Sequence, residues 1–183
     1  MNQLDLSINP ESSKPNNREH YNWLQQAAEW AETKWGYMRN FPGNVERINL
    51  LLEIKQFFYL AIYEAQDKNQ HLVGTFALTP DKVDLEQEKK FLQSKNYVSL
   101  LKNEKAVSLK YVYVHDNFRD FGFGTQILNQ AKQIAKKDHA LMTAHLLTPN
   151  VHGFYAKRDA VFKAEIAETR AHEEPCTLIH FVK

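Results

Sequence analysis

The segment from Val107 to Lys137 constrains the fold of this chain more than any other part of it. It opens with a run rich in β-branched and aromatic residues, Val107 to Val114, which is typical of a strand. A polar turn at residues 115–118 and a glycine-containing loop, Arg119 to Thr125, come next. Beyond the loop, apolar residues recur at helical spacing: Ile127, Leu128, Ala131, Ile134 and Ala135. The segment therefore predicts a strand, a glycine loop and a helix, in that order.

A glycine loop that leads into a helix is suited to bind an anion. The first N–H groups of a helix have no partner within the helix and carry partial positive charge, so a phosphate is stabilised there. Gly122 and Gly124 lack a Cβ and let the backbone approach that phosphate closely. A dinucleotide fingerprint would need a small residue in place of Ile127, and the Gly-Lys-Ser/Thr of a P-loop is absent. The alternative to an anion site is an ordinary glycine-rich turn in an unrelated α/β protein.

The remaining pattern is Arg119-x-x-Gly122-x-Gly124 between a strand and an amphipathic helix. In this setting the chain resembles the GNAT family of N-acetyltransferases, whose motif is Q/R-x-x-G-x-G/A. The resemblance implies a loop that holds the pyrophosphate of acetyl-coenzyme A, bound as a co-substrate. It also implies an α/β fold with a mixed, mostly antiparallel central sheet flanked by helices.

The rest of the chain supplies an order of elements that fits this family. Apolar and polar patterns predict further strands over residues 4–8, 57–65, 71–79, 97–101, 140–147, 161–166 and 176–182. They predict helices over residues 18–36, 44–55 and 81–93 and a short one after Asn150. The highly charged helix at 81–93 is interpreted as a solvated face. We expect one N-acetyltransferase domain over residues 1–183.

Composition excludes several other classes of protein. The net charge of +1 gives no sign of nucleic acid or anionic membrane as a partner. Cys176 is the only cysteine, which excludes an internal disulfide and fits a reducing compartment. The longest apolar run, Phe57 to Tyr63, is too short to span a bilayer, and the N-terminal residues lack the pattern of a secretory signal. We therefore expect a cytoplasmic protein.

The resemblance assigns the coenzyme contacts to the strand and the loop. Backbone groups of Val112, Tyr113 and Val114 would face the pantetheine and the thioester. An N–H there would stabilise the oxyanion formed during attack, an effect worth roughly 3 kcal/mol per donor in other enzymes. The pyrophosphate would be held by Arg119, Asp120, Phe121, Gly122, Phe123, Gly124 and Thr125. For Arg119 the alternative is an exposed cation in a turn.

Tyr155 is the strongest side-chain candidate for catalysis. The family often has an Asn, a short helix and a Tyr whose hydroxyl meets the coenzyme sulfur and protonates the leaving thiolate. In this chain the corresponding residues are Asn150 and Tyr155, at a spacing two residues shorter than the usual family form. The departure weakens the assignment of Asn150 to the coenzyme site more than that of Tyr155. The alternative role for Tyr155 is packing.

A general base is needed because an alkyl ammonium with a pKa near ~10 cannot attack a thioester. Some relatives use a Glu five residues before the Asn, and this chain has His145 there. An imidazole titrates near ~6.5 when unperturbed, which suits that role. A structural hydrogen bond is the alternative for His145, and Glu104 is a second candidate base. Other relatives use a Glu on the central strand, where Ser108 stands and cannot serve.

The acceptor is not identified by the sequence. The resemblance places an amine-bearing small molecule or protein near the first two helices, with candidate lining residues Trp30, Glu32, Trp35, Tyr37 and Phe41. The eight histidines show no metal-ligand spacing, so no metal is expected. The leading hypothesis is an acetyl-coenzyme A-dependent N-acyltransferase, with homodimerisation common in the family. The alternative is a non-catalytic acyl-coenzyme A-binding sensor or protein-interaction module on the same fold.

Overall fold

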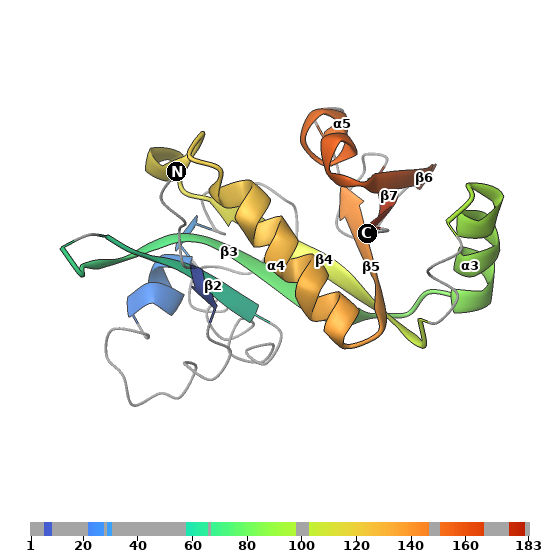
Figure 1. Ribbon diagram of the computed structural model, residues 1–183, viewed down its shortest axis with the longest axis horizontal. Helices are drawn as coiled ribbons and strands as arrows, with labels where there is room; N and C mark the ends of the chain where they lie inside the picture. Colours follow the sequence, from blue (N-terminus) through green and yellow to red (C-terminus); the bar gives the residue numbers. More distant parts are fainter. Residues whose placement is uncertain are drawn as a thin grey trace. The chain divides into compact units, whose positions relative to one another are not determined.

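The computed structural model describes residues 6–8, 22–27, 29–30, 58–65, 67–97, 103–146, 151–166 and 176–181. The chain divides into two compact units: Met1–Ala77 with Tyr111–Asn129, and Leu78–Lys110 with Gln130–Lys183. The elements are β1 (Leu6–Ile8), β2 (Phe58–Glu64), β3 (Gln70–Asp81), α3 (Leu85–Ser94), β4 (Lys105–Val114), η4 (Asp116–Phe118), α4 (Phe123–Lys137), β5 (Ala140–Leu146), α5 (Val151–Phe154), η5 (Ala156–Arg158), β6 (Ala160–Ile166) and β7 (Cys176–Phe181). Figure 1 labels the strands β2 to β7 and the helices α3, α4 and α5. Residues 22–27 and 29–30 are also helical.

The strands follow the order β1-β2-β3-β4-β5-β7-β6 in a mixed sheet. The pairs β1–β2, β2–β3, β5–β7 and β6–β7 are antiparallel, and β4 pairs with β5 in parallel. The α4 helix follows β4 and precedes β5, which is the usual connection between two parallel strands. The predicted α/β class with a mostly antiparallel sheet is confirmed, and β1 lies at an edge of that sheet.

The core of the first unit lies on the β2–β3 hairpin. Alternating side chains of these strands point to one face, where they pack with the helical residues Trp23 and Ala27. The apolar residues of that face are Phe58, Leu60, Ile62, Leu72 and Ala77. Gly74 lies on the same hairpin, and a Cβ there would come within 2.7 Å of Ile127 Cδ1 and would collide with the Tyr113 carbonyl oxygen. The strands predicted over residues 57–65 and 71–79 are therefore present as β2 and β3, and they pair as an antiparallel hairpin.

The core of the second unit lies between α3 and the strands β4, β5 and β6. Leu92 of α3 is fully buried and packs with Ala106, Leu141 and Val161, one residue from each strand. The β4–β5 ladder covers four pairs, from Lys105↔Ala140 to Ser108↔Thr143. On its other edge β5 pairs with β7, from Met142↔Phe181 to Leu146↔Thr177.

Two element boundaries differ from the sequence prediction for local reasons. The α3 helix begins at Leu85 instead of residue 81, because the Asp84 carboxylate accepts hydrogen bonds from the N–H groups of Glu86 and Gln87 and caps the helix. Asp81 is instead the last residue of β3. The predicted helix at 44–55 and residues 98–101 of the predicted strand lie outside the described residues. In the part of the chain that is described, no helix is both long and apolar enough to cross a membrane.

Candidate active site

The glycine loop turns sharply into α4 through two residues with positive φ. Asp120 has a φ of 66° and Gly122 a φ of 85°, both in the left-handed region. The Gly122 carbonyl oxygen accepts hydrogen bonds from the N–H groups of Thr125 and Gln126, each at 3.1 Å. The helix therefore starts at Phe123, and Gly124 and Thr125 belong to its first turn, not to the loop. The first N–H groups of a helix are the ones that bind an anion, so the expected anion site and the observed turn coincide.

Two phenylalanines flank this turn and have opposite environments. Phe123 is 3 % exposed, and its ring packs edge-on against Tyr63 at 5.7 Å and Phe118 at 6.0 Å. Phe121 is 70 % exposed. Phe123 anchors the beginning of α4 on the first unit, so only its backbone N–H is available to a ligand.

Arg119 is held by its own loop. Its Nε donates to the Val114 carbonyl oxygen at 3.3 Å, and its guanidinium forms an ion pair with Asp116. The Asp116 carboxylate also accepts a hydrogen bond from the Tyr113 hydroxyl at 3.3 Å. Burial, followed by the Asp116 charge, raises the pKa of Tyr113 above its usual value. These contacts tie the end of β4 to η4 and fix the shape of the turn before α4.

The end of β4 departs from regular strand geometry. Tyr111 has a φ of 51°, and its carbonyl oxygen accepts a hydrogen bond from Thr75 Oγ1 at 2.9 Å. Val112, Tyr113 and Val114 follow this irregularity and are half-buried. The His115 N–H then donates to the Val73 carbonyl oxygen at 2.9 Å. Trp30 packs on this end of the strand, with its ring 5.3 Å from that of Tyr113 and 5.0 Å from that of His115. The other four predicted acceptor-lining residues lie outside the described residues.

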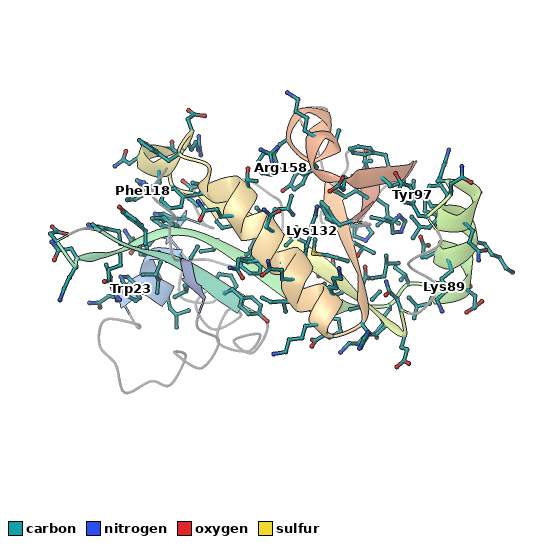
Figure 2. All side chains as sticks on the ribbon, in the orientation of Figure 1. Trp23, Lys89, Tyr97, Phe118, Lys132 and Arg158 are labelled. Atoms are coloured by element: carbon teal, nitrogen blue, oxygen red, sulfur yellow. The ribbon has the colours of Figure 1, made fainter. Side chains whose placement is uncertain are left out.

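Tyr155 follows α5 directly and lies in an aromatic environment of the second unit. Its ring packs edge-on against Phe154 at 4.9 Å and Phe181 at 5.8 Å. Burial raises the pKa of Tyr155 to about 12. Among the described residues its hydroxyl has no hydrogen-bond partner. The η5 turn that follows Tyr155 is held next to α4, since Lys132 Nζ donates to the Arg158 carbonyl oxygen at 2.7 Å (Figure 2).

His145 is exposed near the end of β5, opposite Leu178 of β7. Side chains alternate along a strand, so His145 leaves β5 on the face opposite to Met142. Met142 pairs with Phe181, which contacts Tyr155. His145 and Tyr155 therefore approach the sheet of the second unit from opposite faces. Glu104, the second candidate base, is exposed, and Asn150 lies outside the described residues.

Sequence reasoning missed a group of buried polar residues beneath α3. Glu88 of α3 is 4 % exposed and His180 is fully buried. Glu88 forms an ion pair with Lys163, and its Oε2 lies 2.7 Å from His180 Nε2. Burial lowers the pKa of His180 and Lys163 lowers it further, while Glu88 opposes this shift. The net direction is downward, so His180 is neutral at pH 7.

A second polar contact lies in the same unit, where the Thr143 hydroxyl donates to the Asp81 carboxylate. The interpretation of residues 81–93 as a solvated helix face was thus wrong at Glu88 and at Asp81. A sequence signal for Glu88 existed: it lies at helical spacing between Leu85 and Leu92, both of which pack on the core of this unit. The signal for Asp81 was absent, because its role depends on a contact with residue 143.

The site consists of a strand, a turn with left-handed residues and the N-terminus of a helix. A comparison of the sequence with protein families finds one whose members have this arrangement. The model of the acetyltransferase (GNAT) family matches residues 23–159. The chain belongs to the GNAT family. The match includes residues 23–27 and 29–30 of the first unit, the glycine loop and Tyr155.

Solved structures of GNAT-type proteins share this fold at low sequence identity. An aminoglycoside 6'-N-acetyltransferase in complex with coenzyme A matches with a TM-score of 0.61 and 11 % identity, covering 96 % of this chain and 97 % of that one. The NatC complex bound to Gag peptide and coenzyme A contains a chain with a TM-score of 0.60 and 9 % identity, covering 91 % and 92 %. A putative N-acetyltransferase from Lactobacillus plantarum gives 0.57 and 14 %, covering 98 % and 97 %. A comparison with curated protein sequences gives no match.

Within the described ranges no group of three or more His, Cys, Asp or Glu side chains is placed to hold a metal ion.

Proposed function

We propose that this GNAT protein transfers an acetyl group from acetyl-coenzyme A to a primary amine by direct attack in a ternary complex. The observation that carries the proposal is the turn at Asp120–Gly122, which presents the N-terminus of α4 directly after the irregular end of β4. Two of the similar structures contain coenzyme A, which supports the same ligand here. In the reaction the amine nitrogen forms a bond to the acetyl carbon, the C–S bond breaks, and the amine loses a proton.

The coenzyme phosphates would bind at the first turn of α4. The N–H groups of Phe123 and Gly124 begin the helix, and an anion there is stabilised by the helix dipole, whereas the Thr125 N–H already donates to the Gly122 carbonyl oxygen. The Arg119 guanidinium already pairs with Asp116 and has an exposed fraction of 46 %. Its contribution is therefore to hold the loop in shape, since its charge is already matched by that of Asp116.

The Tyr155 hydroxyl would stabilise the departing thiolate. A pKa of about 12 keeps this hydroxyl protonated across the neutral range, so it is always available as a donor. An ordinary thiol has a pKa near ~8.5, so full proton transfer from Tyr155 to the thiolate is uphill. A hydrogen bond to the sulfur as charge develops is the role that this environment supports.

His145 stays our candidate for the base that removes the amine proton. It leaves β5 on the opposite face to Tyr155, so the base and the leaving-group donor would act from two sides of the sheet. If His145 is the base, kcat/KM rises with pH as the general base loses its proton. His145→Ala then removes this rise, and the exposed His139 replaced by Asn is the matched control. An unchanged profile in His145→Ala assigns the histidine a structural role.

The decisive experiment measures thiol release from acetyl-coenzyme A with a panel of alkyl amines, peptides and aminoglycosides. We expect turnover with at least one acceptor, and a fall in kcat on the order of 10²-fold in Tyr155→Phe. Tyr97→Phe, which removes a hydroxyl from the packing around α3, is the control and keeps its rate. Coenzyme binding without thiol release from any acceptor would support the non-catalytic sensor or interaction module instead.

Coenzyme binding itself is tested by Gly124→Val. The branched side chain in the first turn of α4 blocks the phosphate approach, so calorimetry should show loss of coenzyme A binding while circular dichroism stays unchanged. Gln133→Val, at an exposed position later in the same helix, is the control. Unchanged affinity in a folded Gly124→Val protein would remove the basis of the proposed function. A homodimer and a cytoplasmic location stay predictions.

A further inference from the structure

The irregular end of β4 is matched by the neighbouring segment of β3. The Val73 carbonyl oxygen accepts a hydrogen bond from the His115 N–H at 2.9 Å. The next residue is Gly74, and a Cβ in its place would collide with the Tyr113 carbonyl oxygen. Both contacts lie within the first unit. A side chain at position 74 would therefore exclude the path that β4 takes.

Tyr111 is the residue at which β4 becomes irregular. Its φ of 51° lies in the left-handed region, which is unfavourable for an aromatic residue within a strand. Such a conformation persists only where the surrounding contacts hold it. Its ring packs edge-on against Phe58 at 6.1 Å, and at its backbone Thr75 Oγ1 donates to the Tyr111 carbonyl oxygen at 2.9 Å. Thr75 is 3 % exposed, so this hydrogen bond is shielded from water.

The hydrogen bond from Thr75 also determines where the next N–H group of β4 points. Among the described residues every peptide bond is trans, including the one between Tyr111 and Val112. In a trans peptide the carbonyl oxygen and the N–H of the following residue point in opposite directions. The Tyr111 carbonyl is fixed toward Thr75, so the Val112 N–H is fixed in the direction away from Thr75. One buried hydroxyl thus sets the orientation of a backbone donor in the segment to which the coenzyme thioester is assigned.

We propose that Thr75 is a positioning residue for acetyl transfer, because its hydroxyl holds the Tyr111 peptide so that the Val112 N–H donates to the thioester oxygen. The inference rests on the proposed function and adds to it a residue of β3 that acts through the backbone of β4. When the amine nitrogen attacks the acetyl carbon, negative charge develops on that oxygen, and when the C–S bond breaks the C=O bond forms again. A donor that is aimed in advance stabilises this charge without reorganisation during the reaction.

The kinetic test compares Thr75→Val with Thr79→Val. Both changes replace a hydroxyl of β3 by a methyl group, but among the described residues Thr79 Oγ1 has no hydrogen-bond partner to lose. With the best acceptor of the amine panel, Thr75→Val should lower kcat on the order of 10- to 100-fold, since a complete loss of one oxyanion donor costs about 10²–10³-fold. Its affinity for coenzyme A should not change, and Thr75→Ser should restore most of the rate. Equal kcat values in Thr75→Val and Thr79→Val overturn the inference.

An infrared measurement separates this positioning from a general support of the fold, and it needs no acceptor. An isotope label at the acetyl carbonyl resolves the C=O stretch of bound acetyl-coenzyme A, and a hydrogen bond to the oxygen lowers its frequency. We expect a lowered frequency in the wild type, Thr79→Val and Thr75→Ser, and a return toward the value of free acetyl-coenzyme A in Thr75→Val. An equal frequency in the wild type and Thr75→Val, or no lowering in the wild type, overturns the inference.

The same measurement distinguishes failure of the inference from failure of the proposed function. A wild type that lowers the frequency but releases no thiol with any acceptor keeps the role of Thr75 and rejects the acetyl transfer. A wild type that does not bind acetyl-coenzyme A rejects both.

A third measurement stays decisive even if Thr75→Val does not fold. The backbone amide signal of Val112 is followed while coenzyme A or acetyl-coenzyme A is added, two ligands that differ only in the acetyl group. An N–H that donates to the thioester oxygen shifts with acetyl-coenzyme A and much less with coenzyme A. Thr75→Ser should keep this acetyl-dependent shift, and Thr75→Cys, which offers a weaker donor, should reduce it. Equal responses of the wild type to the two ligands, or equal shifts in Thr75→Ser and Thr75→Cys, contradict the inference.

Discussion

Two ion pairs of this protein join the same kinds of group in opposite surroundings. At the glycine loop, Asp116 and Arg119 form a pair whose side chains are 68 % and 46 % exposed. Under α3, Glu88 and Lys163 form a pair whose side chains are 5 % and 22 % exposed, with His180 beside them. Water screens the charges of the first pair and can solvate each of them separately. The second pair lies in a medium of low polarity, where its charges are screened much less.

Because their exposure differs, the two ion pairs are expected to contribute differently to the stability of the fold. An exposed pair contributes about 0–1 kcal/mol, so the Asp116–Arg119 pair orders the loop before α4 but hardly affects global stability. Formation of a buried pair costs free energy because both charges lose their hydration. Removal of one partner costs more, because the remaining charge is then neither hydrated nor paired. Removal of the Glu88 charge should therefore lower the free energy of unfolding. The variants below test whether the exposed pair has a smaller effect.

The largest effect is expected for Glu88→Gln. The loss of the carboxylate leaves the Lys163 ammonium without its partner, and the breaking of a fully buried pair costs about 3–5 kcal/mol. Lys163 is 22 % exposed and reaches some water, so we expect a smaller loss, about 2–3 kcal/mol, in urea unfolding. Glu86→Gln is the control on the same helix, since Glu86 is 77 % exposed and pairs with Lys89 at 3.5 Å. Equal losses in the two variants would contradict the comparison.

The sequence was most informative where structure is local. The order of strand, loop and helix from Val107 to Lys137 depends on β-branched residues, two glycines and an apolar stripe, all within one segment. The start of α4 at Phe123 was missed by a few residues, because the left-handed φ of Asp120 completes the turn earlier than the glycines alone indicate. The hairpin of β2 and β3 was predictable for the same reason.

The sequence was least informative where structure joins distant segments. Glu88 meets Lys163 and His180, and Asp81 meets Thr143, across 62 to 92 positions of the chain. No local pattern distinguishes a carboxylate that is buried by such a contact from one on a solvated helix. The roles of His145 and Tyr155 stay predictions for a related reason. The strand β5 and the helix α5 determine where the two residues lie, but their chemical roles depend on how the coenzyme and the amine bind.

A glycine substitution tests how much the loop depends on backbone conformation instead of charge. Gly122→Ala places a Cβ at a φ of 85°, where an L-residue costs about 1–2 kcal/mol. The added Cβ meets no other atom within 4 Å, so strain is the only penalty. We expect a corresponding loss in urea unfolding and weaker coenzyme A binding. Gly153→Ala, where a Cβ also meets nothing and φ is not positive, is the control and should leave both unchanged.

The pH dependence of stability tests the buried cluster without breaking it. Burial lowers the pKa of His180 in the folded protein, so the unfolded chain binds a proton first as the pH falls. The stability that comes from a neutral His180 is therefore complete above the unfolded pKa near ~6.5 and falls as the pH drops below it. Urea unfolding of His180→Gln should lose this slope, while His139→Asn should keep it. An equal slope in both variants would assign the effect to other groups.

The smallest effect on stability is expected for Arg119→Gln, the surface counterpart of Glu88→Gln. The ion pair with Asp116 is exposed, so its loss should change the free energy of unfolding by less than about 1 kcal/mol. The loop would still lose the hydrogen bond from Arg119 Nε to the Val114 carbonyl oxygen, which joins the end of β4 to the turn. We therefore expect faster amide hydrogen exchange around residues 115–122 at nearly unchanged global stability. A loss of stability as large as that of Glu88→Gln would mean that exposure does not separate the two pairs.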